Sequence, residues 1–188
     1  MAGKHGVCEI VSADWVTAIA TAGTFVVIAA SAIAALLQLR HTRGSNQIVA
    51  LTECRETLES EEFQNARQFV ALELPKLMED PEMARKLERP FFPQELRPAG
   101  NVANFFESMG AFVRFNIIDR RIACDLWCGV VVSSWNALLP ITRIRRQLDP
   151  GIWENFEYLA VLSEEFMERN PTSYPSRMRR MPIEEPAA

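Results

Sequence analysis

Residues 15–39 read WVTAIATAGTFVVIAASAIAALLQL and contain no charged side chain. As an α-helix rising 1.5 Å per residue, such a stretch is about 37 Å long, and a bilayer has a hydrocarbon core of about 30 Å. Lipid offers the backbone no hydrogen-bond partners, so a segment that crosses it must satisfy its own amides and carbonyls. The stretch therefore predicts one transmembrane helix.

A cleaved signal peptide is the alternative interpretation of this stretch. The apolar region of a signal peptide has about 7 to 15 residues, follows basic residues and precedes a cleavage site with small side chains. Here the apolar run is longer, only Lys4 is basic upstream, and Gln38-Leu39-Arg40-His41 follows the run. These features favour a retained anchor.

The arginines after the stretch indicate its orientation. Arg40 and Arg43 follow the apolar run, against the single Lys4 before it. Basic residues are enriched on the cytoplasmic side of a membrane helix. We therefore expect the C-terminal part of the chain in the cytoplasm, with Arg40 and Arg43 in contact with lipid headgroups.

Composition limits what the remaining sequence can form. The whole chain of 188 residues carries a formal net charge of −4, and the part after residue 43 keeps its acidic excess. This charge disfavours nucleic acid as a main partner, and we expect none, because phosphate binding needs a concentrated basic face. The length suits one compact core rather than two. The four cysteines show no metal-binding or redox spacing, so we expect small core residues in a reducing compartment.

Helical periodicity continues through the rest of the chain and predicts an all-α fold, with one N-terminal transmembrane helix followed by an antiparallel helical bundle. Ser60, Asp80 and Asp119 are expected helix caps, and Asp149-Pro150 is expected to begin the last helix. Pro140 is expected to bend or end the helix that starts near residue 120. Apolar residues at helical spacing form the predicted core faces: Val102, Phe105, Phe106, Met109, Phe112, Val113 and Ile117 in one helix, and Ile122, Leu126, Trp127, Val131 and Leu138 in the next.

These patterns divide the chain into five predicted segments. Residues 1–14 form a short N-terminal tail, 15–39 the transmembrane helix, 40–98 an acidic stalk with peripheral helices, 99–169 the bundle core, and 170–188 a proline-rich disordered tail.

Few residues suited to catalysis are present. The only two histidines, His5 and His41, flank the predicted span, which argues against a histidine-dependent triad or metal centre in the bundle. Neither GxGxxG nor GxxxxGK occurs. We therefore expect no catalytic, metal-binding or cofactor-binding residue, and no cofactor.

Two weaker signals remain as candidate ligand or interface positions. Glu107 and Arg114 lie opposite the phenylalanines of their helix, beside small residues that would let another helix approach closely, and they form either a pair lining an interface or pocket or a solvent-facing pair. Arg143, with Arg145 and Arg146, forms a basic turn after Pro140. This turn either holds a phosphate or a lipid headgroup, or pairs with glutamates of the following helix.

The chain resembles a family of uncharacterised bacterial proteins. The resemblance rests on the span ending in QLR, on NVANFFESMGAFVRFNIID (with Phe105, Phe106, Glu107 and Gly110), on WNALLPITRIRR from Trp135, and on WENFEYLA. It covers roughly residues 15–168. The resemblance implies a small single-span protein of the bacterial inner membrane with a cytoplasmic helical domain, and it supplies no activity.

From these features we expect a membrane-anchored, non-enzymatic interaction or regulatory domain whose partners are the bilayer and a protein. The alternative is a domain that senses a small molecule or lipid, with a pocket between bundle helices near Glu107, Trp135 and Arg143. A homodimer through the small residues of the span is not favoured, because two parallel acidic stalks would repel each other.

Overall fold

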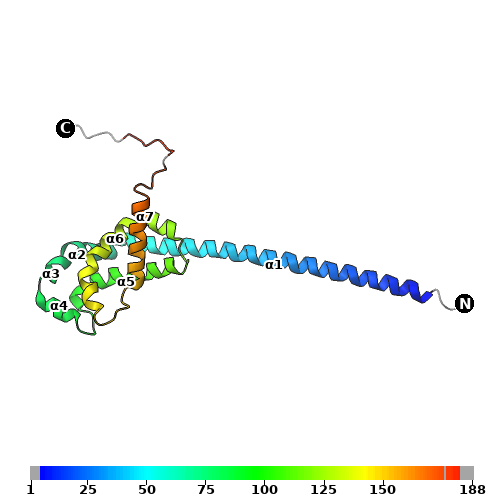
Figure 1. Ribbon diagram of the computed structural model, residues 1–188, viewed down its shortest axis with the longest axis horizontal. Helices are drawn as coiled ribbons and strands as arrows, with labels where there is room; N and C mark the ends of the chain where they lie inside the picture. The colour runs from blue at the N-terminus through cyan, green and yellow to red at the C-terminus, as the bar shows by residue number, and fades with distance from the viewer. Residues whose placement is uncertain (1–4, 176, 183–188) are drawn as a thin grey trace. The chain divides into compact units, whose positions relative to one another are not determined.

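The computed structural model in Figure 1 describes residues 5–175 and 177–182, with side chains from Trp15 onward except at positions 40, 41 and 43. The described residues form helices and no strand, so the all-α prediction is confirmed for them. The elements are α1 (His5–Glu59), α2 (Glu61–Leu72), α3 (Leu74–Met78), α4 (Pro81–Leu87), the short 3-10 helix η1 (Gln94–Leu96), α5 (Arg97–Arg114), α6 (Arg120–Arg145) and α7 (Glu154–Arg169).

The chain divides into two compact units, Met1–Ile48 and Val49–Ala188. In the first unit α1 begins at His5, so residues 5–14 of the predicted tail are helical, and residues 1–4 lie outside the described range. The side chains of residues 15–39 are almost all exposed. The structure describes residues 170–175 and 177–182 of the predicted disordered tail, which form no helix or strand and are exposed. Position 176 and residues 183–188 of this tail lie outside the described residues.

Two helices, α1 from Trp15 and α6, are long and apolar enough to cross a membrane by length and composition alone. The most apolar segment of α1 is 0% buried, whereas 28% of the most apolar segment of α6 is buried. Within the second unit α6 packs against α2, α4, α5 and α7. We therefore treat α6 as a core helix and α1 as the candidate span.

The second unit encloses one hydrophobic core. Its centre is Phe106, which is 0% exposed and stacks on Phe156 with ring centroids 5.1 Å apart. Buried residues from Ala50 to Leu96 join the same cluster as the residues of α5, α6 and α7. Helices α6 and α7 run in opposite directions, because Cys124 contacts Leu162 near one end and Trp135 contacts Phe156 near the other. Figure 1 shows α7 lying across α5 and α6.

The predicted apolar faces of α5 and α6 need correction. Trp127 is half-buried and packs against the edge of the core, while Ile122 and Leu126 are exposed. The face of α6 that is buried is therefore narrower than the face that carries apolar residues. Helix α5 ends at Arg114, and Ile118 rather than Ile117 is buried beyond it. The reason is a left-handed residue, Asn116 (φ 56°), which turns the chain as C-terminal helix caps do.

Three of the four predicted caps are confirmed. Side-chain oxygens of Ser60, Asp80 and Asp119 accept backbone N–H groups in the first turns of α2, α4 and α6. The prediction for Asp149 is wrong. Its carboxylate accepts the N–H of Gly151 at 3.0 Å within a turn, and α7 begins only at Glu154. The chain does not enter the helix after Pro150, because Trp153 takes a left-handed conformation (φ 56°, ψ 37°).

Of the two predicted effects of Pro140, an end or a bend of the helix, the first is wrong, because α6 continues to Arg145. The proline removes one N–H, whose helical acceptor would be the carbonyl of Asn136. Both residues are exposed, so water can satisfy that carbonyl. Because the helix continues, Arg145 and Arg146 of the basic turn are half-buried against the rest of the unit, whereas Arg143 is exposed.

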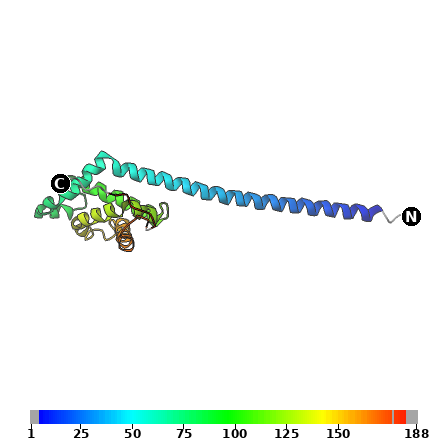
Figure 2. The same ribbon diagram turned by 90° about the horizontal axis from the view of Figure 1, so that it is seen from above.

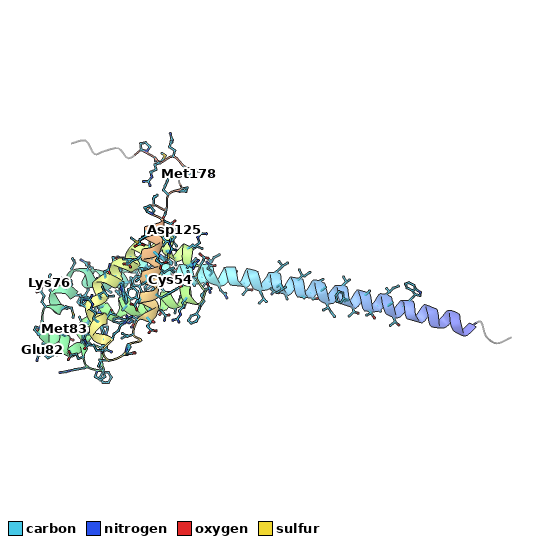
Figure 3. The ribbon with its side chains drawn as sticks, viewed as in Figure 1. Cys54, Lys76, Glu82, Met83, Asp125 and Met178 are labelled. Atoms are coloured by element: carbon cyan, nitrogen blue, oxygen red, sulfur yellow. The ribbon has the colours of Figure 1, made fainter. Side chains whose placement is uncertain are left out.

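Two cysteines lie in the core, as predicted. Cys54, labelled in Figure 3, and Cys124 are buried, while Cys128 is half-buried. Desolvation by burial, with a smaller contribution from the charge of Glu53, raises the pKa of Cys54 to about 11. The thiol is therefore protonated at neutral pH.

Cys54 is expected to resist alkylation in the folded protein. It is 4% exposed, and a thiol with this pKa is about one part in a thousand thiolate at pH 8. Mass spectrometry after iodoacetamide treatment at pH 8 should find Cys54 unmodified, and the same treatment in guanidinium should label it. Rapid labelling without denaturant would mean that the end of α1 opens from the core.

Candidate functional site

The carboxylate of Glu107, on α5, binds the N-terminus of α7. Its Oε2 accepts the backbone N–H of Phe156 at 2.8 Å, and its Oε1 accepts the side-chain amide of Asn155 at 2.7 Å. The first N–H groups of a helix lack partners within the helix and carry partial positive charge. Glu107 is therefore a capping residue supplied by another helix.

Helix α7 needs this external cap because its own N-cap residue provides none. Trp153 occupies the N-cap position and makes no side-chain capping hydrogen bond. Its indole Nε1–H instead donates to Oδ1 of Asn104 at 3.0 Å. Asn104 and Glu107 are three residues apart, so one face of α5 holds both Trp153 and the first turn of α7.

Close approach of the two helices depends on Gly110. A Cβ atom built at this position would fall against the backbone carbonyl of Asn155. The expectation that small residues here admit another helix is confirmed for Gly110. Next along α5, Arg114 Nη1–H donates to Asn155 Oδ1 at 3.1 Å. Glu107 and Arg114 thus meet through Asn155, at the α5–α7 interface, and among the described residues they form no direct ion pair.

Trp135 supports the same helix end from α6. Its ring meets that of Phe156 edge-on at 5.0 Å, and the guanidinium of Arg146 lies 5.6 Å above Trp135. Arg146 also donates to the carbonyl of Ile152 at 3.1 Å and pairs with Glu157 at 2.8 Å. The expected pairing of the basic turn with a glutamate of the following helix is therefore confirmed for Arg146.

Arg145 holds the connector that follows α4. Its guanidinium donates to the carbonyls of Leu87 at 3.2 Å, Arg89 at 2.7 Å and Pro90 at 3.4 Å. It also lies 5.9 Å from the ring of Phe92. The Nε atom of Arg145 is buried and has no hydrogen-bond partner within the described part of the chain. Such an atom in a native structure calls for an explanation, for example an ordered water or ion.

A cavity of about 470 Å³ opens between this connector, the start of α5 and Trp153. The predicted pocket near Glu107, Trp135 and Arg143 is thus present at Glu107, but neither Trp135 nor Arg143 lines it. Arg143 is exposed and lies on the opposite side of α6 from Arg145, which does line the cavity. The polar and aromatic residues that line the cavity are Phe92, Arg97, Asn101, Asn104, Glu107, Arg145 and Trp153.

The remaining predicted positions, Arg40 and Arg43, lie within the backbone of α1, and their side chains are outside the described residues. Within the part of the chain that the structure describes, no three His, Cys, Asp or Glu side chains lie together as potential metal ligands. Sequence reasoning missed Asn104 and Asn155, and it placed Arg145 in the basic turn without predicting that it binds the connector after α4. Only Asn104 had a local signal, its position one turn before Glu107 on the polar face of α5.

Replacing Glu107 with alanine is expected to lower the free energy of unfolding by about 1–2 kcal/mol, because the first turn of α7 loses its cap and Asn155 loses an acceptor. Glu107→Gln keeps one acceptor oxygen and should lose about half as much. Urea unfolding followed by tryptophan fluorescence measures both. Equal stability of all three proteins would show that water replaces the carboxylate without cost.

Comparison with known proteins places the chain in a family. A family model described as Domain of unknown function (DUF4760) matches residues 25–162. No curated protein and no solved structure matches the chain. The family match includes Glu107, Gly110, Asn155 and the whole of α5 and α6. Because it covers most of the sequence, the expected resemblance to an uncharacterised domain family is confirmed, and the chain belongs to the DUF4760 family of domains of unknown function.

Proposed function

We propose that this chain is a single-pass protein of the bacterial inner membrane whose C-terminal helical unit acts in the cytoplasm as a non-enzymatic interaction or regulatory domain. The observation that carries the proposal is the uncharged, exposed helix of residues 15–39, which precedes a unit with a closed core of its own. An exposed apolar surface of this length is unfavourable in water and favourable in lipid.

A reporter fusion tests the membrane orientation. The two arginines after the span, Arg40 and Arg43, favour a cytoplasmic C-terminus. Green fluorescent protein fused after Ala188 should therefore fluoresce, and alkaline phosphatase fused at the same place should be inactive. Phosphatase activity would refute the orientation. Release of the full chain from membranes by alkaline carbonate would refute the anchor itself.

The polar side chains of the second unit support an interaction role rather than catalysis. Glu107, Asn155 and Arg146 use their polar atoms to join helices, and both histidines lie outside this unit, at positions 5 and 41. A rigid helical unit held at the membrane is suited to bind another protein.

Purification from native membranes tests the interaction role. A partner should copurify in constant ratio with the full chain and with Phe91→Ala, which changes only an exposed side chain. It should be lost from Gly110→Ala, which disrupts helix packing while the anchor remains. A partner that copurifies equally with all three binds the span or the detergent and would contradict the proposal.

The buried, unpartnered Nε of Arg145 beside the 470 Å³ cavity favours a second candidate function, the sensing of a small anion. Arg97 also lines the cavity, and the carboxylate of Glu107 is already occupied by two donors. Bound ligand stabilises a folded protein, by about 2.7 kcal/mol at a hundred times its dissociation constant. Inorganic phosphate should thus raise the Tm of the full chain. The shift should be smaller in Arg97→Gln and unchanged in Arg143→Gln. No shift at millimolar phosphate would refute a phosphate site.

A further inference from the structure

The corner between α5 and α6, residues 114–122, exposes large apolar side chains. Phe115 is 70% exposed, Ile117 45% and Ile122 41%. Between them Ile118 is fully buried in the core. An exposed group of aromatic and aliphatic side chains on a folded unit indicates a contact surface.

The backbone holds these side chains outward. The N–H groups of Ile117 and Ile118 both donate to the carbonyl of Phe112, at 2.8 and 3.2 Å, and close the end of α5 around Asn116. Asp119 then caps α6 through the N–H groups of Arg121 and Ile122, at 2.8 and 3.2 Å. With Ile118 anchored between the two caps, the exposure of Phe115 and Ile117 belongs to an ordered turn and costs no further ordering on binding.

Three arginines surround the apolar corner. Arg114 lies 5.9 Å from the ring of Phe115, and Arg120 and Arg121 begin α6 and are exposed. Three acidic side chains lie near these arginines. The carboxylate of Asp119 is bound to backbone N–H groups, and Asp125 lies one turn further along α6. Glu165 of α7 lines a cavity with Arg120 and Arg121, and its charge is paired with Arg169 at 2.9 Å. The corner is therefore both apolar and positively charged, although the chain as a whole is acidic.

This chemistry matches a membrane surface better than a protein. Side chains at a lipid interface combine apolar groups that enter the headgroup boundary with arginines that attract anionic lipid. A stable protein interface needs about 800 Å² from each partner, whereas three side chains offer on the order of 400 Å².

The chain also brings the corner within reach of the bilayer. Only residues 40–48 separate the predicted span from Val49, so even a fully extended connection is at most about 35 Å long. Figures 1 and 2 both show the α5–α6 corner beside the part of α1 that enters the second unit. A short tether gives the corner a high effective concentration at the lipid surface, so weak attraction is sufficient.

We propose that the α5–α6 corner docks onto the anionic surface of the membrane, with Phe115 and Ile117 entering the headgroup boundary and Arg114, Arg120 and Arg121 contacting lipid phosphates. The inference rests on the proposed membrane anchor. Docking would fix the orientation of the second unit, so that its other faces point to the cytoplasm.

A tryptophan placed at the corner tests the docking in the full chain. Phe115→Trp is reconstituted in nanodiscs of phosphatidylcholine, with or without phosphatidylglycerol, and quenched by brominated acyl chains. The matched control is Phe91→Trp, at a site that is 87% exposed. Subtracting wild-type emission leaves the added tryptophan. We expect quenching at least about twofold greater at position 115 than at position 91 in anionic discs, decreasing with salt.

Charge reversal provides the second measurement. Arg120→Glu with Arg121→Glu in the Phe115→Trp protein should abolish the extra quenching, whereas Arg85→Glu should not. Circular dichroism verifies the fold of each variant. Equal quenching at positions 115 and 91 in a protein that resists carbonate extraction overturns the docking and leaves the anchor intact. A protein that carbonate extracts overturns the anchor and the docking together.

Discussion

Gly110→Ala is expected to destabilise the second unit by about 3 kcal/mol or more. The added Cβ would lie 2.5 Å from the carbonyl carbon of Asn155 and still closer to its oxygen. The obstacle is backbone at the first turn of α7, so no side chain can rotate out of the way. Helices α5 and α7 would have to separate, which weakens the bonds of Glu107 to Asn155 and Phe156.

Gly129→Ala is the matched control for this substitution. Gly129 lies inside α6, and a Cβ there would meet nothing within 4 Å. Alanine favours a helix over glycine by about 1 kcal/mol, so this variant should be more stable than the wild type. Urea unfolding in detergent, followed by tryptophan fluorescence, gives both values. A Gly110→Ala protein as stable as Gly129→Ala would contradict the close approach of α5 to α7.

Phe106→Ala should cost about 3–5 kcal/mol. The ring stacks on Phe156 and meets Phe105 and Phe63 edge-on, at centroid distances of 5.1, 5.1 and 6.0 Å. Its removal leaves a cavity among residues from α2, α5 and α7 at once, and neighbouring helices can fill it only by shifting together. The whole unit should therefore lose stability in a single transition.

Phe91→Ala serves as the control, because the ring of Phe91 is exposed and its loss should change stability by less than about 0.5 kcal/mol. The comparison uses the same unfolding experiment, with the far-ultraviolet circular dichroism of the whole chain recorded alongside tryptophan fluorescence. Similar losses from Phe106→Ala and Phe91→Ala would mean that Phe106 is not at the centre of the core.

Part of the candidate site was predictable from the sequence. Glu107 and Gly110 lie on the polar, small-residue face opposite the phenylalanines of α5, and helical spacing alone separates the two faces. Their partner, Asn155, could not be identified. It lies 48 residues away from Glu107, at the start of a helix whose own sequence indicated a cap at Asp149. Likewise, nothing in the neighbouring sequence distinguished Arg145 and Arg146, which bind other segments, from Arg143, which is exposed.

The sequence by itself determined what depends on neighbouring residues: the uncharged stretch 15–39, the helical periodicity, the caps at Ser60, Asp80 and Asp119, and the position of Phe106 on a buried face. These features follow from interactions within about one helical turn or from side-chain polarity. Tertiary structure alone decided that Glu107 caps α7, that α6 continues through Pro140 so that Arg145 and Arg146 face inward, and that Phe115 and Ile117 remain outside while Ile118 is buried. The cap on α7 depends on a contact between segments distant in sequence, which no local pattern records. The course of α6 through Pro140 depends on the exposure of that side of the helix, and the turn before Ile118 depends on the left-handed backbone of Asn116.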